Sequence, residues 1–184
     1  MNKLILASSS PRRIEILTKA GFIFDTKPCS KEENADKSLS SEQTVEFLAE
    51  QKAEDVFKRF GGVVLGADTV VSYNGQILGK PKDKHDAVRM LKLLSGKTHF
   101  VFTGYCIIAD GVFILNHDKT EVVFNNLSDK LINDYVESGL CKGKAGSYGI
   151  QDGYNLVKEY NGSYNNVVGL PIERIEKTLK ELLK

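Results

Sequence analysis

The sequence predicts an α/β protein built around a large antiparallel or mixed sheet. Helical and extended signals alternate along the 184 residues, without internal repeats, low-complexity tracts or an evident linker. The dipeptides Asn74-Gly75 and Asp110-Gly111 lie between extended segments and predict hairpins, which pair strands in antiparallel fashion. We therefore expect one domain over residues 1–184, with helices packed against a sheet.

The N-terminal segment predicts a strand, a tight loop and the start of a helix. Residues 4–7 are typical of a buried strand, Ser10 can cap the following helix, and Pro11 suits its first position because a missing N–H costs nothing there. Arg12 and Arg13 would then lie beside unpaired backbone donors, an arrangement that attracts phosphate oxygens. Two interpretations of this motif alone stay open: a polyphosphate site, or a capped surface helix with two solvated arginines.

The spacing of apolar residues predicts the next helices and strand, and glycines mark where the helices end. Apolar residues at helical spacing run to Gly21, and residues 22–24 are expected as a second strand. The polar and charged residues 30–41 predict a loop. Residues 42–60 predict a helix that ends at the glycine pair after it.

A carboxylate interrupts the most apolar segment of the chain. Residues 63–71 are typical of a buried strand, yet they contain Asp68 and Thr69. A buried carboxylate is costly unless it is paired, hydrogen-bonded or metal-bound, so we favour a functional role for Asp68 over a structural one in which neighbouring amides bind it. A hairpin and a strand over residues 76–78 then lead to Lys80, which we expect near Asp68.

The remaining elements complete the alternation. We expect helices over residues 83–94, 129–137 and 172–183, strands over residues 99–109, 112–116 and 119–124, a turn at residues 161–163 and an extended segment over residues 167–171. Ser128 is expected to cap the second of these helices. The glycine-rich residues 144–153 fit either a loop that wraps a nucleotide or a plain series of tight turns.

Composition excludes several classes of function. The 25 Lys and Arg residues nearly balance the 24 Asp and Glu residues, so the chain lacks the broad basic field of a nucleic-acid-binding protein. No apolar stretch approaches the roughly 20 residues that span a bilayer, and no secretory signal precedes the first strand, so we expect a cytoplasmic protein without membrane contact. The three cysteines and three histidines form no ligand-like cluster; Cys106 is expected in the core.

Six ordered motifs over residues 4–172 resemble the Maf family of nucleoside triphosphate pyrophosphatases. The motifs are Ser8-Ser9-Ser10-Pro11-Arg12-Arg13, Gly66-Ala67-Asp68-Thr69-Val70-Val71, Gly79-Lys80-Pro81, Leu94-Ser95-Gly96, Lys144-Ala145-Gly146-Ser147-Tyr148-Gly149-Ile150-Gln151, and Gly162-Ser163-Tyr164 followed by Val168-Gly169-Leu170-Pro171. Any one of them alone would be a weak signal, but six in order make coincidence implausible.

The resemblance implies a fold, a reaction and a cofactor. The implied fold is two-lobed, with a long curved mixed sheet flanked by helices, similar to the inosine triphosphatases, and with the nucleotide in a cleft between the lobes. The implied reaction is hydrolysis between the α and β phosphates with Mg²⁺ or Mn²⁺, by a protein that is commonly a homodimer. The family's association with septum formation implies an alternative, a non-catalytic nucleotide-binding regulator of cell division.

The resemblance also assigns site residues. Asp68 is the implied catalytic base or, alternatively, a metal ligand, and Glu33 or Glu32 would assist the metal. The implied substrate-binding residues are Ser8, Arg12, Arg13, Lys52, Thr69, Lys80 and Gln151.

Three of these residues resemble the dTTP/UTP branch of the family rather than the 7-methyl-GTP branch. They are Arg12, Thr69 and Gln151, and the amide of Gln151 offers both a donor and an acceptor to a pyrimidine edge. Asp152 departs from the pattern, because a glycine is usual there. We expect it to add a negative charge near the base loop, which leaves the relative preference among pyrimidine nucleotides open.

Overall fold

The computed structural model describes residues 3–32 and 34–184, which form an α/β fold. The elements follow in the order β1 (Leu4–Leu6), α1 (Pro11–Lys19), β2 (Phe24–Thr26), α2 (Ser41–Phe60), β3 (Val63–Tyr73), β4 (Gln76–Leu78), α3 (Lys84–Leu94), β5 (Thr98–Ala109), β6 (Val112–Phe124), α4 (Asp129–Glu137), the 3₁₀ turn η1 (Ala145–Ser147), β7 (Val157–Asn161), α5 (Tyr164–Val168) and α6 (Ile172–Leu182). No helix in the described residues is both long and apolar enough to cross a membrane.

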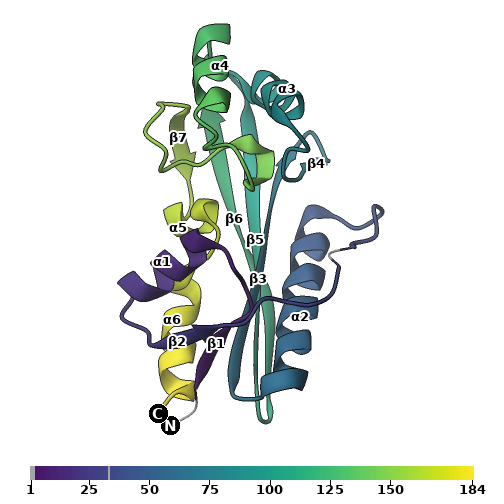
Figure 1. The fold of residues 1–184 in the computed structure, drawn as a ribbon, viewed down its shortest axis with the longest axis vertical. Helices are drawn as coiled ribbons and strands as arrows, with labels where there is room; N and C mark the ends of the chain where they lie inside the picture. The colour runs from purple at the N-terminus through teal and green to yellow at the C-terminus, as the bar shows by residue number, and fades with distance from the viewer. Residues whose placement is uncertain (1–2, 33) are drawn as a thin grey trace.

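The sheet has seven strands and is mixed, as predicted. Its order is β2-β1-β3-β5-β6-β7, and β4 pairs with β3 beside this path. Strand β1 runs parallel to β2 and β3, whereas the pairs formed by β3, β5, β6 and β7 along the path are antiparallel. The long strands β3, β5 and β6 run through most of the length of the molecule (Figure 1).

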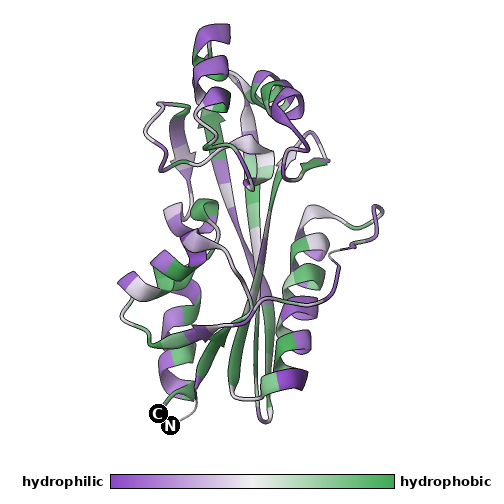
Figure 2. Ribbon diagram, in the orientation of Figure 1, coloured by the Kyte–Doolittle hydropathy of each residue, from purple (hydrophilic) through white to green (hydrophobic). Residues whose placement is uncertain are grey.

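Two lobes share these long strands (Figure 1). The terminal lobe, defined here as β1, β2, α1, α2 and α6 with the strands they flank, has a core on each sheet face: Leu65 packs with α1 and α6, and Val64 packs with α2. The distal lobe, defined as β4, α3, α4 and β7 with the other ends of the strands, has its own core around Leu91 and Tyr135. Figure 2 shows hydrophobic strands where α2 and α6 flank them and more hydrophilic outer helix surfaces. The two-lobed expectation is confirmed.

Two glycines allow helix α2 to lie directly on the sheet. A Cβ at Gly66 would lie 2.3 Å from the carbonyl oxygen of Ala49, and one at Gly104 would lie 2.3 Å from that of Val45. Both oxygens belong to α2, so any side chain at either glycine would push the helix away. This close contact brings Lys52 of α2 within reach of β3.

The predicted hairpin and helix ends are largely confirmed. Asn74 and Gly75 both have positive φ, 49° and 75°, as a type I′ turn between β3 and β4 requires. The hydroxyl of Ser128 accepts a hydrogen bond from the amide of Leu131 and caps α4. Ser10 is the N-cap of α1, but its side chain makes no capping bond.

Four predictions about strands were wrong or incomplete. The second strand is Phe24–Thr26 rather than residues 22–24, and Ile23 is 95% exposed. Residues 112–124 form one strand, because ladder pairing with β5 continues through the polar residues at its centre. Residues 167–171 are not extended: α5 covers Tyr164–Val168. Strand β7 was missed, since its side chains are mostly exposed and carry no apolar alternation.

Candidate active site

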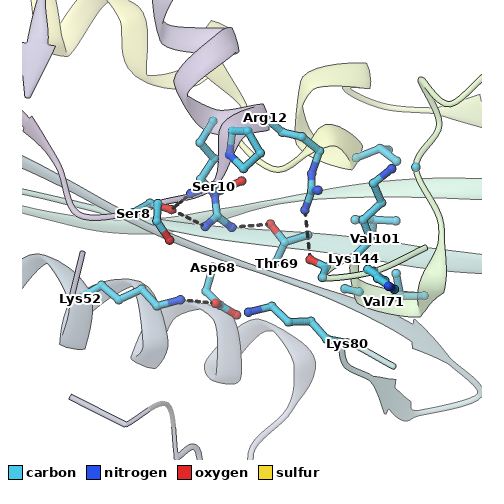
Figure 3. Close-up of a pocket in the computed structure, with 18 of the residues that line it drawn as sticks. Ser8, Ser10, Arg12, Lys52, Asp68, Thr69, Val71, Lys80, Val101 and Lys144 are labelled. Carbon is cyan, nitrogen blue, oxygen red and sulfur yellow. Dashed lines mark hydrogen bonds and ion pairs between the residues drawn. The ribbon is translucent and has the colours of Figure 1, made fainter. Parts of the chain in front are cut away.

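A pocket of about 430 Å³ opens between the two lobes. All of the expected substrate-binding residues line it, together with Asp68: Ser8, Arg12, Arg13, Lys52, Thr69, Lys80 and Gln151. Ser8 and the arginines come from the loop and helix after β1, whereas Lys80 and Gln151 come from the distal lobe. Figure 3 shows the side chains of several of these residues converging on one space.

The carboxylate of Asp68 is buried against an ammonium group. The side chain of Asp68 lies on the α2 face of β3, and the Nζ of Lys52 donates to its Oδ1 at 2.6 Å. The side chains are 12% and 7% exposed, respectively. The ammonium of Lys80 also points toward this carboxylate (Figure 3). The cost of burying Asp68 is therefore offset by an ion pair, and no amide in the described part of the chain donates a hydrogen bond to it.

Arg13 holds three segments together at the pocket wall. Its Nε donates to the carbonyl of Gly169 at 2.8 Å, its Nη1 to the Oγ of Ser8 at 3.3 Å, and its Nη2 to the Oγ1 of Thr69 at 3.1 Å. Ser8 lies after β1, Thr69 in β3, and Gly169 after α5. The guanidinium is buried, so Arg13 fixes the shape of this wall.

A chain of hydroxyl groups continues from Arg13 into the sheet. The Oγ1 atoms of Thr69 and Thr103 lie 2.9 Å apart, and Thr103 donates to the carbonyl of Asn166 at 2.9 Å. A hydroxyl has one proton, so Thr69 donates to Thr103 and accepts from Arg13. The hydroxyl of Thr69 is thereby oriented by its neighbours, and it lies on the sheet face opposite Asp68.

Arg12 reaches across the mouth of the pocket. Its Nη2 donates to the carbonyl of Gly143 at 3.3 Å, which connects α1 to the loop before η1. Burial lowers the pKa of the Arg12 guanidinium, and the negative charge of Asp152 opposes this effect. The group stays cationic in the neutral range, because arginine has the highest pKa of the side chains.

The glycine-rich loop forms the distal wall of the pocket. The amide of Gly146 donates to the carbonyl of Gly79 at 3.0 Å, and Gly146 has a φ of 64° that favours glycine. The hydroxyl of Tyr148 lies 2.8 Å from the Nε2 of the buried His99. Gln151 is exposed and is one of the residues that line the pocket. The segment is thus a series of tight turns, and several of its residues line the pocket.

Asp152 adds a carboxylate to this loop, as expected, but a lysine of the same loop neutralises it. Its side chain is 6% exposed and forms an ion pair with Lys144. The hydroxyl of Tyr135 donates to the Oδ2 of Asp152 at 2.5 Å. The loop folds back on itself over eight residues and brings the two charges together, which local sequence pattern does not reveal.

Comparisons with known proteins show the family of this chain. The family model for Maf-like proteins matches residues 3–182. The chain belongs to the Maf-like family. It is 50% identical to the dTTP/UTP pyrophosphatase of Thermococcus gammatolerans over 180 residues, covering 97% of this chain and 96% of that protein. It is 46% identical to the dTTP/UTP pyrophosphatase of Bacillus pumilus over 183 residues, covering 98% and 96%.

A solved structure shares the fold of this Maf-like protein. A HAM1 protein from Coxiella burnetii superposes with a TM-score of 0.55 at 15% identity, covering 98% of this chain and 100% of that chain. At this identity the likeness concerns the fold alone. It agrees with the two-lobed α/β architecture predicted for the Maf-like chain.

The donor set of this Maf-like protein fits a metal ion that arrives with its substrate. Glu33 lies outside the described residues, and Glu32 is exposed, accepts a hydrogen bond from Asn34 and does not line the pocket. Asp68 is the one carboxylate among the described lining residues, and no group of three His, Cys, Asp or Glu side chains in residues 3–32 and 34–184 could hold a metal ion. Mg²⁺ usually binds through one or two carboxylates together with waters and substrate phosphates. A pocket with a single carboxylate is compatible with this mode of binding.

The sequence interpretation of the Maf-like chain missed the basic lining residue Lys142. Lys144 and Tyr148 also line the pocket, and the sequence analysis quoted both in the glycine-rich motif without assigning either of them a role in the site. Lys142 is exposed, whereas Lys144 and Tyr148 are buried. Two lysines that flank Gly143, just before a glycine-rich segment, were the available signal for a basic pocket wall.

Proposed function

We propose that the protein hydrolyses dTTP and UTP to the monophosphate and diphosphate in the presence of a divalent metal ion. The observation that carries the proposal is the placement of Asp68 beside Lys52, with Lys80 and Arg12 around the same pocket. Relatives at 46–50% identity over nearly the whole chain bear the name dTTP/UTP pyrophosphatase. The residues expected for that branch, including Gln151, line the pocket.

Charge neutralisation and positioning supply most of the catalysis in this proposal. A triphosphate carries several negative charges, and the cations of Arg12, Lys80 and Lys142 line the space that would hold it. Arg13 holds the wall behind it through its hydrogen bonds to Gly169, Ser8 and Thr69. Ser8 and Thr69, two of the residues that Arg13 binds, also line the pocket. The same hydrogen bonds therefore hold the wall and position residues of the anion site.

Asp68 would act on the reacting centre through its second oxygen. Lys52 occupies Oδ1, so Oδ2 remains to orient the attacking water and accept its proton, or to ligate the metal. The water oxygen forms a new bond to phosphorus while the bond between the α and β phosphates breaks. A divalent cation, held by Asp68 together with phosphate oxygens, would supply further charge neutralisation and would acidify the water.

The Asp68→Asn variant tests the proposal. Pyrophosphate release is measured from dTTP, UTP, CTP, GTP and 7-methyl-GTP with Mg²⁺ or Mn²⁺. We expect release from dTTP and UTP by the wild type and a loss of about 10²–10⁴-fold in the variant, since the amide cannot accept the proton and is a poor metal ligand. Asp134→Asn on the exposed face of α4 is the matched control and should keep full activity.

Other outcomes would contradict the proposal. Near wild-type activity in Asp68→Asn would remove Asp68 from the mechanism. Nucleotide binding by the folded wild type without any pyrophosphate release would favour the non-catalytic regulator of cell division. Release from 7-methyl-GTP alone would contradict the assignment of the base preference to Arg12, Thr69 and Gln151.

A further inference from the structure

Thr69 lines the pocket with a hydroxyl group whose proton is already committed. Its Oγ1 accepts a hydrogen bond from the Nη2 of Arg13 at 3.1 Å and lies 2.9 Å from the Oγ1 of Thr103. The hydroxyl of Thr103 donates its own proton to the carbonyl oxygen of Asn166 at 2.9 Å, so the proton of Thr69 points to Thr103. Thr69 therefore keeps no proton for a ligand.

The direction of this chain of hydrogen bonds is fixed at both ends. The guanidinium of Arg13 carries donors only, and a carbonyl oxygen such as that of Asn166 is an acceptor only. Thr103 and Asn166 are fully buried, so turning the hydroxyl of Thr103 toward Thr69 would take a donor away from a carbonyl in the protein interior, which is costly. Among the described residues only Arg13 donates to the Oγ1 of Thr69. Toward the pocket this oxygen is therefore an acceptor.

The part of the pocket beside this oxygen is apolar. Val71 and Val101 line the pocket and pair with each other in the ladder of β3 and β5, two residues along from Thr69. Val167 also lines it and packs, like the two other valines, in the distal core. Because side chains alternate along a strand, these valines of the sheet share a face with Thr69, whereas Asp68 lies on the other face. The apolar ring of a base therefore fits beside Thr69, and the phosphates fit among the lysines around Asp68.

An acceptor beside the base distinguishes one pyrimidine from another. Enzymes that act on nucleobases read the Watson–Crick edge through hydrogen bonds. At N3, uracil and thymine carry a hydrogen, whereas cytosine carries a lone pair. An oxygen that can only accept binds N3–H, but it places two acceptors against each other when the base is cytosine, and such unpaired polar groups cost affinity.

We infer that Thr103 is a positioning residue: together with the carbonyl of Asn166 it holds the hydroxyl of Thr69 as an acceptor for N3–H, and so selects uracil and thymine nucleotides over cytosine nucleotides. This inference rests on the proposed function, because it names what sets the base preference of the same site. Thr103 is fully buried and does not line the pocket, so it acts through Thr69 and does not touch the nucleotide.

The Thr103→Val variant tests the inference, because valine has the shape of threonine without the hydroxyl. The proton of Thr69 is then released and can be donated to the N3 of cytosine. Affinities for the non-hydrolysable α,β-imido analogues of UTP and CTP are measured by titration calorimetry. We expect the preference for the UTP analogue to fall about tenfold, through tighter binding of the CTP analogue. A purely structural role of Thr103 would lower the melting temperature without this gain in affinity.

Two further threonine variants separate positioning from stability. Thr103→Ser keeps the hydroxyl and should keep the preference, although the loss of a buried methyl group lowers the melting temperature. Thr120→Val removes another fully buried hydroxyl, which bonds to the side chain of Asn166 and to the carbonyl of Ser163 but not to Thr69. This variant should also have a lower melting temperature and an unchanged preference.

Thr69→Val keeps the test decisive if Thr103→Val fails to fold. It removes the acceptor itself from a half-buried position, so the UTP analogue should bind about tenfold more weakly while the CTP analogue loses no affinity. An unchanged preference in folded Thr103→Val or in Thr69→Val overturns the inference. A wild type that binds the two analogues equally overturns it as well.

Failure of the proposed function is distinguishable from failure of this inference. A wild type that prefers the UTP analogue but releases no pyrophosphate from UTP overturns only the proposed function. A wild type that releases pyrophosphate from UTP, together with an unchanged preference in Thr103→Val, overturns only the inference. A wild type that binds neither analogue and releases no pyrophosphate overturns both.

Discussion

The buried charged side chains in and behind the pocket have different kinds of partner. Lys52 neutralises Asp68, Lys144 neutralises Asp152, and oxygen acceptors surround Arg13. The lining cations that remain exposed or half-buried, Arg12, Lys80 and Lys142, therefore determine the charge that a ligand meets. A protein with a formal net charge of only +1 can thus attract a polyanion locally.

His99 makes the stability of the fold depend on pH. Its ring is fully buried, and burial lowers its pKa from 6.5 to about 4. Between these values the unfolded chain binds a proton that the folded protein does not, so stability falls as the pH falls from 6.5 toward 4. We expect the free energy of unfolding from urea titrations to be about 2 kcal/mol lower at pH 5 than at pH 7.

Two histidine variants check this assignment. His99→Gln should abolish the difference between pH 5 and pH 7, because the replaced side chain does not titrate. His85→Gln should leave the difference intact, since His85 is exposed. A difference that persists in His99→Gln would show that other groups cause it.

At the scale of elements, the contact between α2 and the sheet determines the geometry around Asp68. Gly104 lies opposite Asp68 in the ladder of β3 and β5, and a Cβ there would lie 2.3 Å from the carbonyl oxygen of Val45. Gly104→Ala should therefore displace α2, and Lys52 with it. We expect a loss of about 1–3 kcal/mol in the free energy of unfolding together with reduced pyrophosphate release.

Gly79→Ala is the control for this prediction. No atom lies within 4 Å of a Cβ at Gly79, and its φ is outside the left-handed region. Urea titration should place this variant close to the wild type. If Gly104→Ala were equally stable, the close packing of α2 would not be required.

The sequence predicts most elements because their signals are local. Apolar spacing and a serine cap identify α4, and an Asn-Gly pair identifies the β3–β4 turn. Asp68 stands out because it interrupts an apolar run. The partners of Asp152 and Thr69 could not be predicted, since they depend on how the loop folds back and on contacts such as Thr103, 34 residues from Thr69. Strand β7 was missed because its pairing with β6, not its side chains, defines it.

At the scale of the whole molecule, the pocket uses residues from both lobes. Ser8 and Arg12 belong to the terminal lobe, and Lys80 and Gln151 to the distal lobe. The long strands β3, β5 and β6 connect the lobes. The hydrogen bond from Arg12 to the carbonyl of Gly143 also crosses the pocket between the two lobes. A nucleotide with its triphosphate on one lobe and its base on the other would add a second connection.

A non-hydrolysable α,β-imido analogue of dUTP should therefore stabilise both lobes together. At a concentration of 100 Kd it should add about 2.7 kcal/mol to the free energy of unfolding, which corresponds to a rise in melting temperature of roughly 5–10 °C for a chain of this size. Amide hydrogen exchange should slow both in residues 8–13 and in residues 142–151, because the ligand contacts both segments. Deoxyuridine without phosphates is the control, and it should protect neither segment appreciably, since the cations of the pocket have nothing to bind. Protection confined to one lobe would contradict a ligand that bridges the two.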